Sequence, residues 1–255
     1  MKKYIRFHTA ENKTPQFGMI ENDTVTVLAK APWDEIIETD DKYELSSIRQ
    51  IAPVVPSKII CVGLNYHAHV AASYSADEAP ENPLLFLKPS SAIIGSGENI
   101  IHPKQSERVD YEAELGVVIG KTAKNVSEKN ADEYIFGFTC VNDVTARDLQ
   151  KKDGQWSRAK GFDTFCPTGP HIVQNVDYSS ILIEGIVNGE TIQSGRTAQM
   201  IFKIPFLIEY ISSVMTLYPG DLISTGTPAK IAPMKSGDEI EVRIENVGSL
   251  KNKMS

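Results

Sequence analysis

The chain of 255 residues has 41% hydrophobic and 23% charged residues and a formal net charge of −7. This length is enough for a sizeable core, either in one large domain or in a small domain followed by a larger one. The acidic charge and the lack of any Lys/Arg cluster argue against a nucleic-acid partner. No apolar run reaches the length of a membrane span, so no membrane association is expected.

Residues 4–28 alternate apolar and polar side chains around turn signals, which predicts a small antiparallel sheet. A short helix is predicted over Glu44–Ile51, and two prolines then interrupt the chain before residue 57. We therefore expect a small β-rich N-terminal module, residues 1–54, followed by a catalytic domain, residues 55–255.

Strands dominate the second part of the chain. Asn65 and Ser127 are predicted to cap the helices that follow them. Because strands and helices do not alternate regularly, a doubly wound parallel fold is not expected. The predicted strands are Lys58–Gly63, Leu84–Lys88, Leu115–Ile119, Phe136–Val141, Leu217–Thr225 and Glu239–Glu245, and the predicted helices are Tyr66–Ser73, Ser127–Tyr134 and Lys203–Ser212.

The cysteines Cys61, Cys140 and Cys166 lie far apart and match neither a CxxC motif nor zinc-finger spacing. Residues 1–8 contain no apolar stretch of the kind found in secretory signals. We therefore expect a cytoplasmic protein in a reducing compartment.

Two acidic residues begin a strand that is otherwise apolar and β-branched. Successive strand residues point to opposite faces, so Glu112 and Glu114 share one face and Ala113 takes the other. Neighbouring carboxylates that are partly buried repel each other and lose hydration, unless a cation such as a divalent metal lies between them. A pair of solvent-facing glutamates at a strand end is an equally good interpretation of these residues alone.

Asp143 is a third carboxylate, placed where another apolar strand ends. Three oxygen donors on one side of a cation suit a hard ion such as Mg²⁺ or Mn²⁺ and leave positions open for water and substrate. Asp143 is also a common type of turn or cap residue. The spacing therefore leaves both interpretations open. The chain has no GxxxxGK[ST], GxGxxG, HExxH or GxSxG motif to suggest another chemistry.

Five motifs together make the sequence recognisable. In this order they resemble the fumarylacetoacetate hydrolase (FAH) family, in its shorter microbial and acylpyruvase-like branch, over residues 57–255. Each motif alone is weak, whereas five in order are highly specific and favour a metal site. The motifs are Gly63-Leu64-Asn65-Tyr66-His67-Ala68-His69, Phe86-Leu87-Lys88-Pro89, Asp110-Tyr111-Glu112-Ala113-Glu114-Leu115, Asn142-Asp143-Val144-Thr145-Ala146-Arg147-Asp148 and Pro219-Gly220-Asp221-Leu222-Ile223-Ser224-Thr225-Gly226-Thr227-Pro228.

The resemblance implies an α+β, β-rich fold, in which an FAH-type mixed β-sheet roll or barrel forms the catalytic domain of a homodimer. It implies a divalent ion, Mg²⁺ or Mn²⁺, held by Glu112, Glu114 and Asp143. The family's substrates are small 2-oxo acids, and its reactions include C–C hydrolysis, decarboxylation and keto–enol or double-bond isomerisation. All of these need an enolate stabilised next to a carboxylate, which a metal can provide as a Lewis acid.

Four further residues take roles from the matched motifs. Arg147 lies one helical turn past Asp143, where its forked donors can bind a substrate carboxylate, and Gln150 can orient water or substrate. The resemblance implies that Lys160 stabilises negative charge and that Thr227 contacts the bound carboxylate. From the residues alone, surface ion pairs, a solvated helix residue and a turn former are the alternatives.

His69 is the candidate general base, because the family has a histidine there that activates water. A lone helical histidine is more often structural, and His67 is interpreted in that way. Many relatives carry a glutamate three residues after this histidine, but here the residue is Ala72. Either Glu78 or Glu81 substitutes, or the acid–base pair is absent, which favours decarboxylation or isomerisation over hydrolysis.

The predicted function is metal-dependent C–C hydrolysis of an acylpyruvate or fumarylacetoacetate-type 1,3-diketo acid. His69 is expected to deprotonate water, and closure of the stretch Ser73–Glu81 is expected to exclude bulk solvent. The alternative is an isomerase of the 2-hydroxyhepta-2,4-diene-1,7-dioate type or an oxaloacetate decarboxylase on the same site. A third interpretation is a non-catalytic metal-binding protein that retains the fold.

Overall fold

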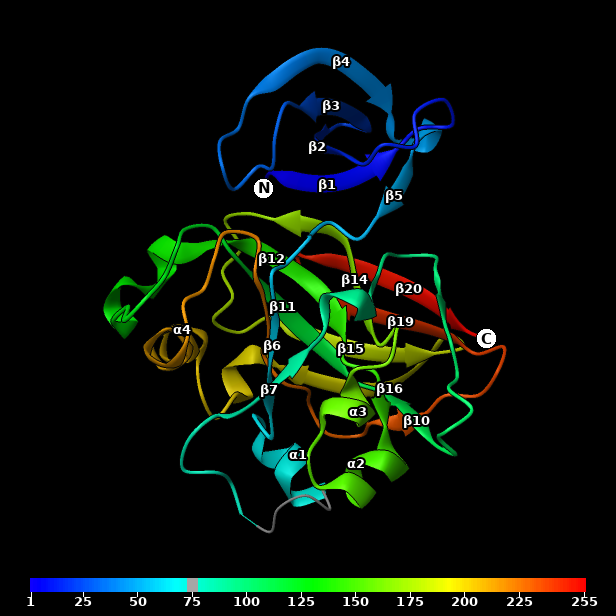
Figure 1. Ribbon diagram of the computed structural model, residues 1–255, viewed down its shortest axis with the longest axis vertical. Helices are drawn as coiled ribbons and strands as arrows, with labels where there is room; N and C mark the ends of the chain where they lie inside the picture. The colour runs from blue at the N-terminus through cyan, green and yellow to red at the C-terminus, as the bar shows by residue number, and fades with distance from the viewer. Residues whose placement is uncertain (73–77) are drawn as a thin grey trace.

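The computed structural model of the chain describes residues 1–72 and 78–255 (Figure 1). The helices are α1 (His67–Ala72), α2 (Arg147–Asp153), α3 (Ser157–Lys160) and α4 (Ile204–Val214), with 3₁₀ turns at Leu45–Ser47, Ser90–Ala92, Glu128–Tyr134 and Thr197–Gln199. The strands are β1 (Lys3–His8), β2 (Gln16–Glu21), β3 (Thr24–Leu28), β4 (Glu38–Glu44), β5 (Arg49–Ile51), β6 (Ile59–Gly63), β7 (Leu84–Lys88), β8 (Ile93–Ile94), β9 (Asn99–Ile100), β10 (Val109–Tyr111), β11 (Ala113–Ile119), β12 (Ile135–Asn142), β13 (Thr145–Ala146), β14 (Cys166–Val173), β15 (Leu182–Val187), β16 (Glu190–Arg196), β17 (Leu222–Ser224), β18 (Ala232–Pro233), β19 (Glu239–Ile244) and β20 (Gly248–Met254).

A large mixed sheet runs through the whole molecule. Its order within the described residues is β4-β3-β2-β1-β14-β12-β11-β17-β6-β7, with β5 on β1 and β8 on β14. Most neighbours are antiparallel, whereas β17 and β6 are parallel. A second sheet, β16-β15-β19-β20-β9, packs against the first, and β13-β10-β18 form a small third sheet. The prediction of a β-rich fold that is not doubly wound is confirmed.

The apolar run of β11 is buried on both faces. Leu115 and Val117 pack in a core that also contains residues of β19 and α4, whereas Val118 packs in a second core with residues of β1 and β14. Alternate side chains of one strand therefore enter two different cores. Because both faces of β11 are packed, the strand next to the acidic residues is held in a fixed position.

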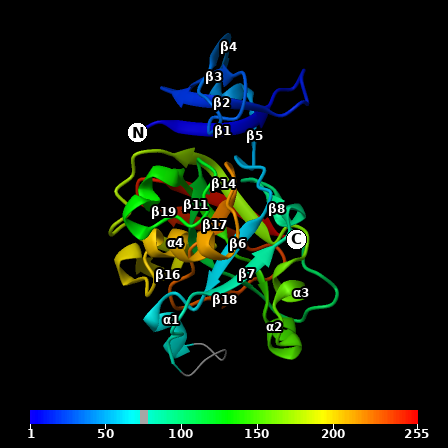
Figure 2. The same cartoon turned by 60° about the vertical axis from the view of Figure 1, so that its left-hand side comes forward.

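Strands β1–β4 form a lobe at one end of the molecule, while α1, α2 and α3 lie at the other end (Figures 1 and 2). Strand β1 joins the lobe to the rest, because it pairs with β2 and β5 and also with β14. The three helices surround the ends of the strands that carry the predicted site residues. No helix in the described ranges is long and apolar enough to cross a membrane.

Four local predictions are wrong, and the cap predicted at Asn65 is the last of them. The segment Glu44–Ile51 forms a single 3₁₀ turn and then β5, because its backbone pairs with β1 and its apolar residues Leu45 and Ile48 pack on the lobe core. Ser127 begins a 3₁₀ helix but its side chain makes no cap hydrogen bond. The strand predicted over Leu217–Thr225 is limited to β17, since a turn joins Tyr218 and Asp221.

Asn65 is the second predicted helix cap. Its buried side chain bonds to distant backbone groups instead of capping the helix that follows. Its amide nitrogen donates to the carbonyl oxygens of Phe202 and Thr225, and its amide oxygen accepts the N–H of Phe202. Asn65 therefore ties the start of α1 to two distant loops, one of which carries Thr227.

Candidate metal centre and active site

Three buried carboxylates meet where β10, β11 and β12 converge. Glu112 lies between β10 and β11, Glu114 is the second residue of β11, and Asp143 directly follows β12. The register pairs Ala113 with Asn142, and the N–H of Asp143 donates to the Glu112 carbonyl oxygen at 2.9 Å. One oxygen from each carboxylate lies within 4.8 Å of the others. The structure thus brings together the three predicted metal ligands.

Two of the three carboxylates have cationic partners. Lys160 Nζ lies 2.9 Å from Glu112 Oε2 and 2.5 Å from Asp143 Oδ2. Lys88 also pairs with Asp143, and Arg147 pairs with Glu112. These five groups form a buried network in which both anions are held from two sides.

Glu114 has neutral partners instead. Its Oε2 accepts the hydroxyl of Ser224 at 2.5 Å and the N–H of Gly226 at 2.9 Å. Gly226 has a φ of 99°, and a Cβ there would lie 2.7 Å from Cβ of Asn65, so both the turn and its close packing require glycine. The loop after β17 is therefore shaped to bring a backbone donor to Glu114.

The pKa shifts show where positive charge is lacking. Burial would raise the pKa of Glu112, but Lys160 and Arg147 outweigh it and hold that pKa well below its usual range. Burial, together with the charges of Asp143 and Glu112, raises the pKa of Glu114 to about 8. A cation next to Glu114 would remove this penalty. Three hard oxygen donors and one uncompensated carboxylate therefore fit a divalent ion such as Mg²⁺ or Mn²⁺.

Arg147 is oriented by three polar contacts. Its Nε donates to Asp110 Oδ2 at 2.9 Å, its Nη1 donates to Gln150 Oε1 at 2.6 Å, and its Nη2 pairs with Glu112. Asp110 is itself held by an ion pair with Arg108. Arg147 begins α2 and Gln150 follows one turn later, so both face the same cavity, as the sequence predicts.

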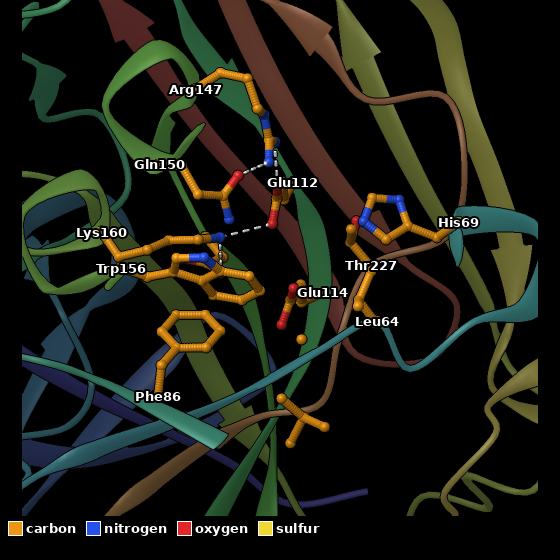
Figure 3. Close-up of a pocket in the computed structure, with 13 residues that line it drawn as sticks. Leu64, His69, Phe86, Glu112, Glu114, Arg147, Gln150, Trp156, Lys160 and Thr227 are labelled. Atoms are coloured by element: carbon orange, nitrogen blue, oxygen red, sulfur yellow. Dashed lines mark hydrogen bonds and ion pairs between the residues drawn. The ribbon is translucent and has the colours of Figure 1, made fainter. Parts of the chain in front are cut away.

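The cavity contains all the residues that the sequence singles out (Figure 3). Its free volume is about 20 Å³, which is enough for one water molecule or ion. His69 and Thr227 lie on one side of the two glutamates, and Lys160, Gln150 and Arg147 lie on the other. The described residues that line it are Val62, Gly63, Leu64, His69, Phe86, Glu112, Glu114, Asp143, Arg147, Gln150, Trp156, Lys160 and Thr227.

His69 is buried, unlike its neighbour His67, which is exposed. Burial lowers the pKa of His69; Glu112 raises it, and the nearby Arg147 and Lys160 lower it further. The imidazole is therefore neutral near pH 7 and can accept a proton. Lys160 behaves in the opposite way, because Asp143 and Glu112 raise its pKa against the effect of burial.

Thr227 lines the cavity with its hydroxyl already engaged. The hydroxyl donates to the Ala113 carbonyl oxygen at 2.9 Å and accepts from Gln193 Nε2 at 2.7 Å. The resemblance implies that Thr227 contacts a substrate carboxylate. To donate to that carboxylate, the Thr227 hydroxyl would have to give up its hydrogen bond to Ala113. In this structure Thr227 instead holds the start of β11 against the loop after β17.

The sequence interpretation missed several residues of the site. Lys88 lies in the motif Phe86-Leu87-Lys88-Pro89, and a lysine at the end of an apolar strand is a signal for a buried ion pair. Ser224 and Asp110 were also present in motifs without a role. Trp156 gave no local signal, because its place in the cavity depends on packing against β6 and β7.

A substitute for the missing glutamate near His69 is not found among the described residues that line the cavity. Glu78 and Glu81 are both exposed and do not line it. Residues 73–77 lie outside the described ranges, so the closure expected for Ser73–Glu81 stays a prediction.

Comparison with known proteins identifies the family. The family model described as fumarylacetoacetate (FAA) hydrolase C-terminal matches residues 58–255, and the model described as Rv2993c-like, N-terminal, matches residues 2–53. The chain therefore belongs to the fumarylacetoacetate hydrolase family. Members of this family usually bind a divalent metal, in agreement with the buried carboxylate group.

Two named relatives are tautomerases, and one similar solved structure is that of an isomerase. Oxaloacetate tautomerase Fahd2a, mitochondrial, from Rattus norvegicus is 43% identical over 221 residues, which cover 82% of this chain and 70% of that protein. Oxaloacetate tautomerase YisK from Bacillus subtilis is 41% identical over 239 residues, covering 89% and 79%. The crystal structure of 5-carboxymethyl-2-hydroxymuconate delta-isomerase from Mycobacterium smegmatis is similar with a TM-score of 0.92 and 41% identity, covering 99% and 98% of the two chains.

Proposed function

We propose that this protein is a metal-dependent isomerase that interconverts the keto and enol tautomers of a small 2-oxo acid such as oxaloacetate. The observation that carries the proposal is the placement of a neutral base, His69, opposite a cation, Lys160, across the carboxylate group. The names of the relatives support the same reaction class. Mg²⁺ or Mn²⁺ as the ion, a homodimer and a cytoplasmic location remain predictions.

Tautomerisation moves one proton between the carbon next to the 2-oxo group and the 2-oxo oxygen. In the proposed site His69 removes this proton from carbon, and the charged Lys160 and Arg147 stabilise the oxyanion that develops. The imidazolium of His69 then gives the proton to that oxygen, which forms the enol and leaves His69 neutral. A divalent ion held by Glu112, Glu114 and Asp143 would act as a Lewis acid that stabilises the enolate. Gln150 keeps Arg147 in place during the reaction through its hydrogen bond.

Hydrolysis makes a further demand that these residues do not meet. A water molecule must be activated for attack, and the family's glutamate partner for the histidine is replaced by Ala72. The acidic residues Glu78 and Glu81 are exposed. Isomerisation needs no attacking water, so we prefer an isomerase over the hydrolase that the sequence predicts, and cleavage of an acylpyruvate becomes the competing outcome of the assay.

The first prediction concerns the reaction itself. With Mg²⁺, purified protein is expected to accelerate the enol-to-keto conversion of oxaloacetate by about 100-fold or more, measured by the loss of enol absorbance. Removal of the metal by EDTA should abolish the acceleration, and added Mg²⁺ should restore it. Faster cleavage of an acylpyruvate, or release of CO₂ from oxaloacetate at the same rate, would contradict the proposal.

The second prediction separates the two histidines of α1. His69→Gln is expected to lower kcat by about 10²–10³-fold while the affinity for Mg²⁺ stays unchanged, because His69 moves a proton and holds no metal.

In the wild type, activity should fall as the pH drops below the ordinary histidine pKa of 6.5, since the pKa of His69 is lowered and only its neutral form accepts a proton.

The matched control for this substitution is His67→Gln, two residues away on the same helix and exposed. It should leave both kcat and the pH profile unchanged. Equal losses in the two variants would show that the helix, rather than the His69 imidazole, is responsible.

A further inference from the structure

We propose that a groove beside the metal-site cavity binds an uncharged aromatic or branched apolar group at the far end of the 2-oxo acid. This inference rests on the proposed function and names a substrate class that the groove favours over oxaloacetate, whose far end is a carboxylate. The groove lies between β7 and the segment that joins α2 to α3, with Leu84–Leu87 on one side and residues from Gln150 to Ser157 on the other.

The groove adjoins the metal-site cavity, because Phe86, Gln150 and Trp156 line both spaces. The free volume of the cavity is about 20 Å³, whereas that of the groove is about 920 Å³. The cavity has room for the metal ion, so the far end of a substrate bound to that ion would have to lie in the groove.

An aromatic pair, Phe86 and Trp156, belongs to the lining of both spaces, and Figure 3 shows the two rings beside each other in the metal-site cavity. The rings of Phe86 and Trp156 meet edge to face, with centroids 5.2 Å apart and planes at 70°. Trp156 packs over Gly63, where a Cβ would lie 2.7 Å from the ring. Lys160 Nζ lies 4.9 Å from the centroid of Phe86. The pair therefore has Lys160 on one side and the groove on the other. Its position depends on Gly63, because a side chain at that residue would overlap the ring of Trp156.

The lining of the groove indicates the chemistry of the occupant. Leu84 and Leu87 are 39% and 49% exposed, although both are apolar. No carboxylate lines the groove in the described part of the chain, and Lys151, its one charged side chain there, already interacts within the protein. Leucine and tryptophan side chains gain most from an uncharged apolar or aromatic group.

The test uses two unreactive analogues that differ by one ring. Oxamate carries the chelating carboxylate and carbonyl, and oxanilate adds a phenyl group at the far end. Calorimetric titration of the Mg²⁺-loaded protein should give about tenfold tighter binding of oxanilate, because the ring is buried in the groove. Leu87→Asp should remove most of this gain and leave the affinity for oxamate unchanged.

Ile101→Asp is the matched control, since Ile101 is 51% exposed and lies outside the groove. It should keep the full preference for oxanilate. A second readout does not depend on these variants: in a Trp33→Phe background Trp156 becomes the one remaining tryptophan of the sequence. Its emission should change more on binding of oxanilate than on binding of oxamate, because the added ring lies against Trp156 in the groove.

Four results would overturn the inference. Equal affinities for oxamate and oxanilate would show that the groove is not used, while oxamate binding alone would leave the proposed function intact. An equal gain from N-oxalylglycine, which carries a far carboxylate, would show that an uncharged tail is not selected. A change of oligomeric state in Leu87→Asp would assign the groove to a second copy of the chain. Failure of Mg²⁺-loaded protein to bind oxamate would reject both the proposed function and the inference.

Discussion

Glu114→Gln is expected to abolish binding of a divalent metal and to lower turnover by about 10³-fold or more. The variant keeps nearly the same shape, and its amide oxygen can still accept from Ser224 and Gly226. What it loses is the negative charge, which forms no ion pair with any residue in the described ranges. The same change should therefore stabilise the metal-free protein by about 1–3 kcal/mol, because it removes an uncompensated buried carboxylate.

Glu112→Gln is the matched comparison for this prediction. It should also abolish metal binding, but it should destabilise the metal-free protein by about 2–4 kcal/mol, because Arg147 and Lys160 lose a buried partner. Calorimetry of metal binding and denaturant unfolding without metal measure the two effects. Retained metal binding in Glu114→Gln, or a stability change of the same sign in both variants, would refute the assignment.

Lys160→Met is expected to separate catalysis from metal binding. The variant should lower kcat by about 10²–10³-fold, since the cation facing the developing oxyanion is removed. It should at the same time bind the divalent ion about tenfold more tightly, because Lys160 competes for Glu112 and Asp143. An opposite change in affinity and rate is difficult to produce by general disruption of the fold.

Lys88→Met provides the control for Lys160→Met. Both lysines are buried and both pair with Asp143, but Lys88 is not among the described residues that line the cavity. Its replacement should therefore cost stability, with a loss in kcat of less than about tenfold. Equal rate losses in the two variants, measured in metal-saturated protein, would show that the network acts only as a scaffold.

The carboxylate site could be predicted because its residues lie close together along two paired strands. Glu112 and Glu114 are neighbours on one strand, and Asp143 follows directly after the strand that pairs with it. The ordered motifs then joined these two segments. Lys88 could not be assigned in the same way, since it reaches Asp143 across 55 positions of sequence, and β6, β17 and β11 lie between β7 and β12 in the sheet.

The incorrect predictions have a shared physical cause. Asn65 is of a residue type that is common at helix caps, but its side chain bonds instead to the backbone of Phe202 and Thr225, which no local pattern reveals. The segment Glu44–Ile51 has helical spacing, but the free edge of β1 provides hydrogen bonds for an extended chain. In both cases tertiary partners outweigh a weak local preference.

The pairing of β1 with β14 has a consequence for how the N-terminal lobe can vary among relatives. Lys3 and Tyr4 pair with Val173 and Ile172, so the lobe covers part of the β14 edge that would otherwise be open. An uncovered edge is a template for aggregation with other chains. A relative that lacks residues 2–53 must therefore protect this edge in another way, and the lobe can be exchanged in evolution only for a segment that does so.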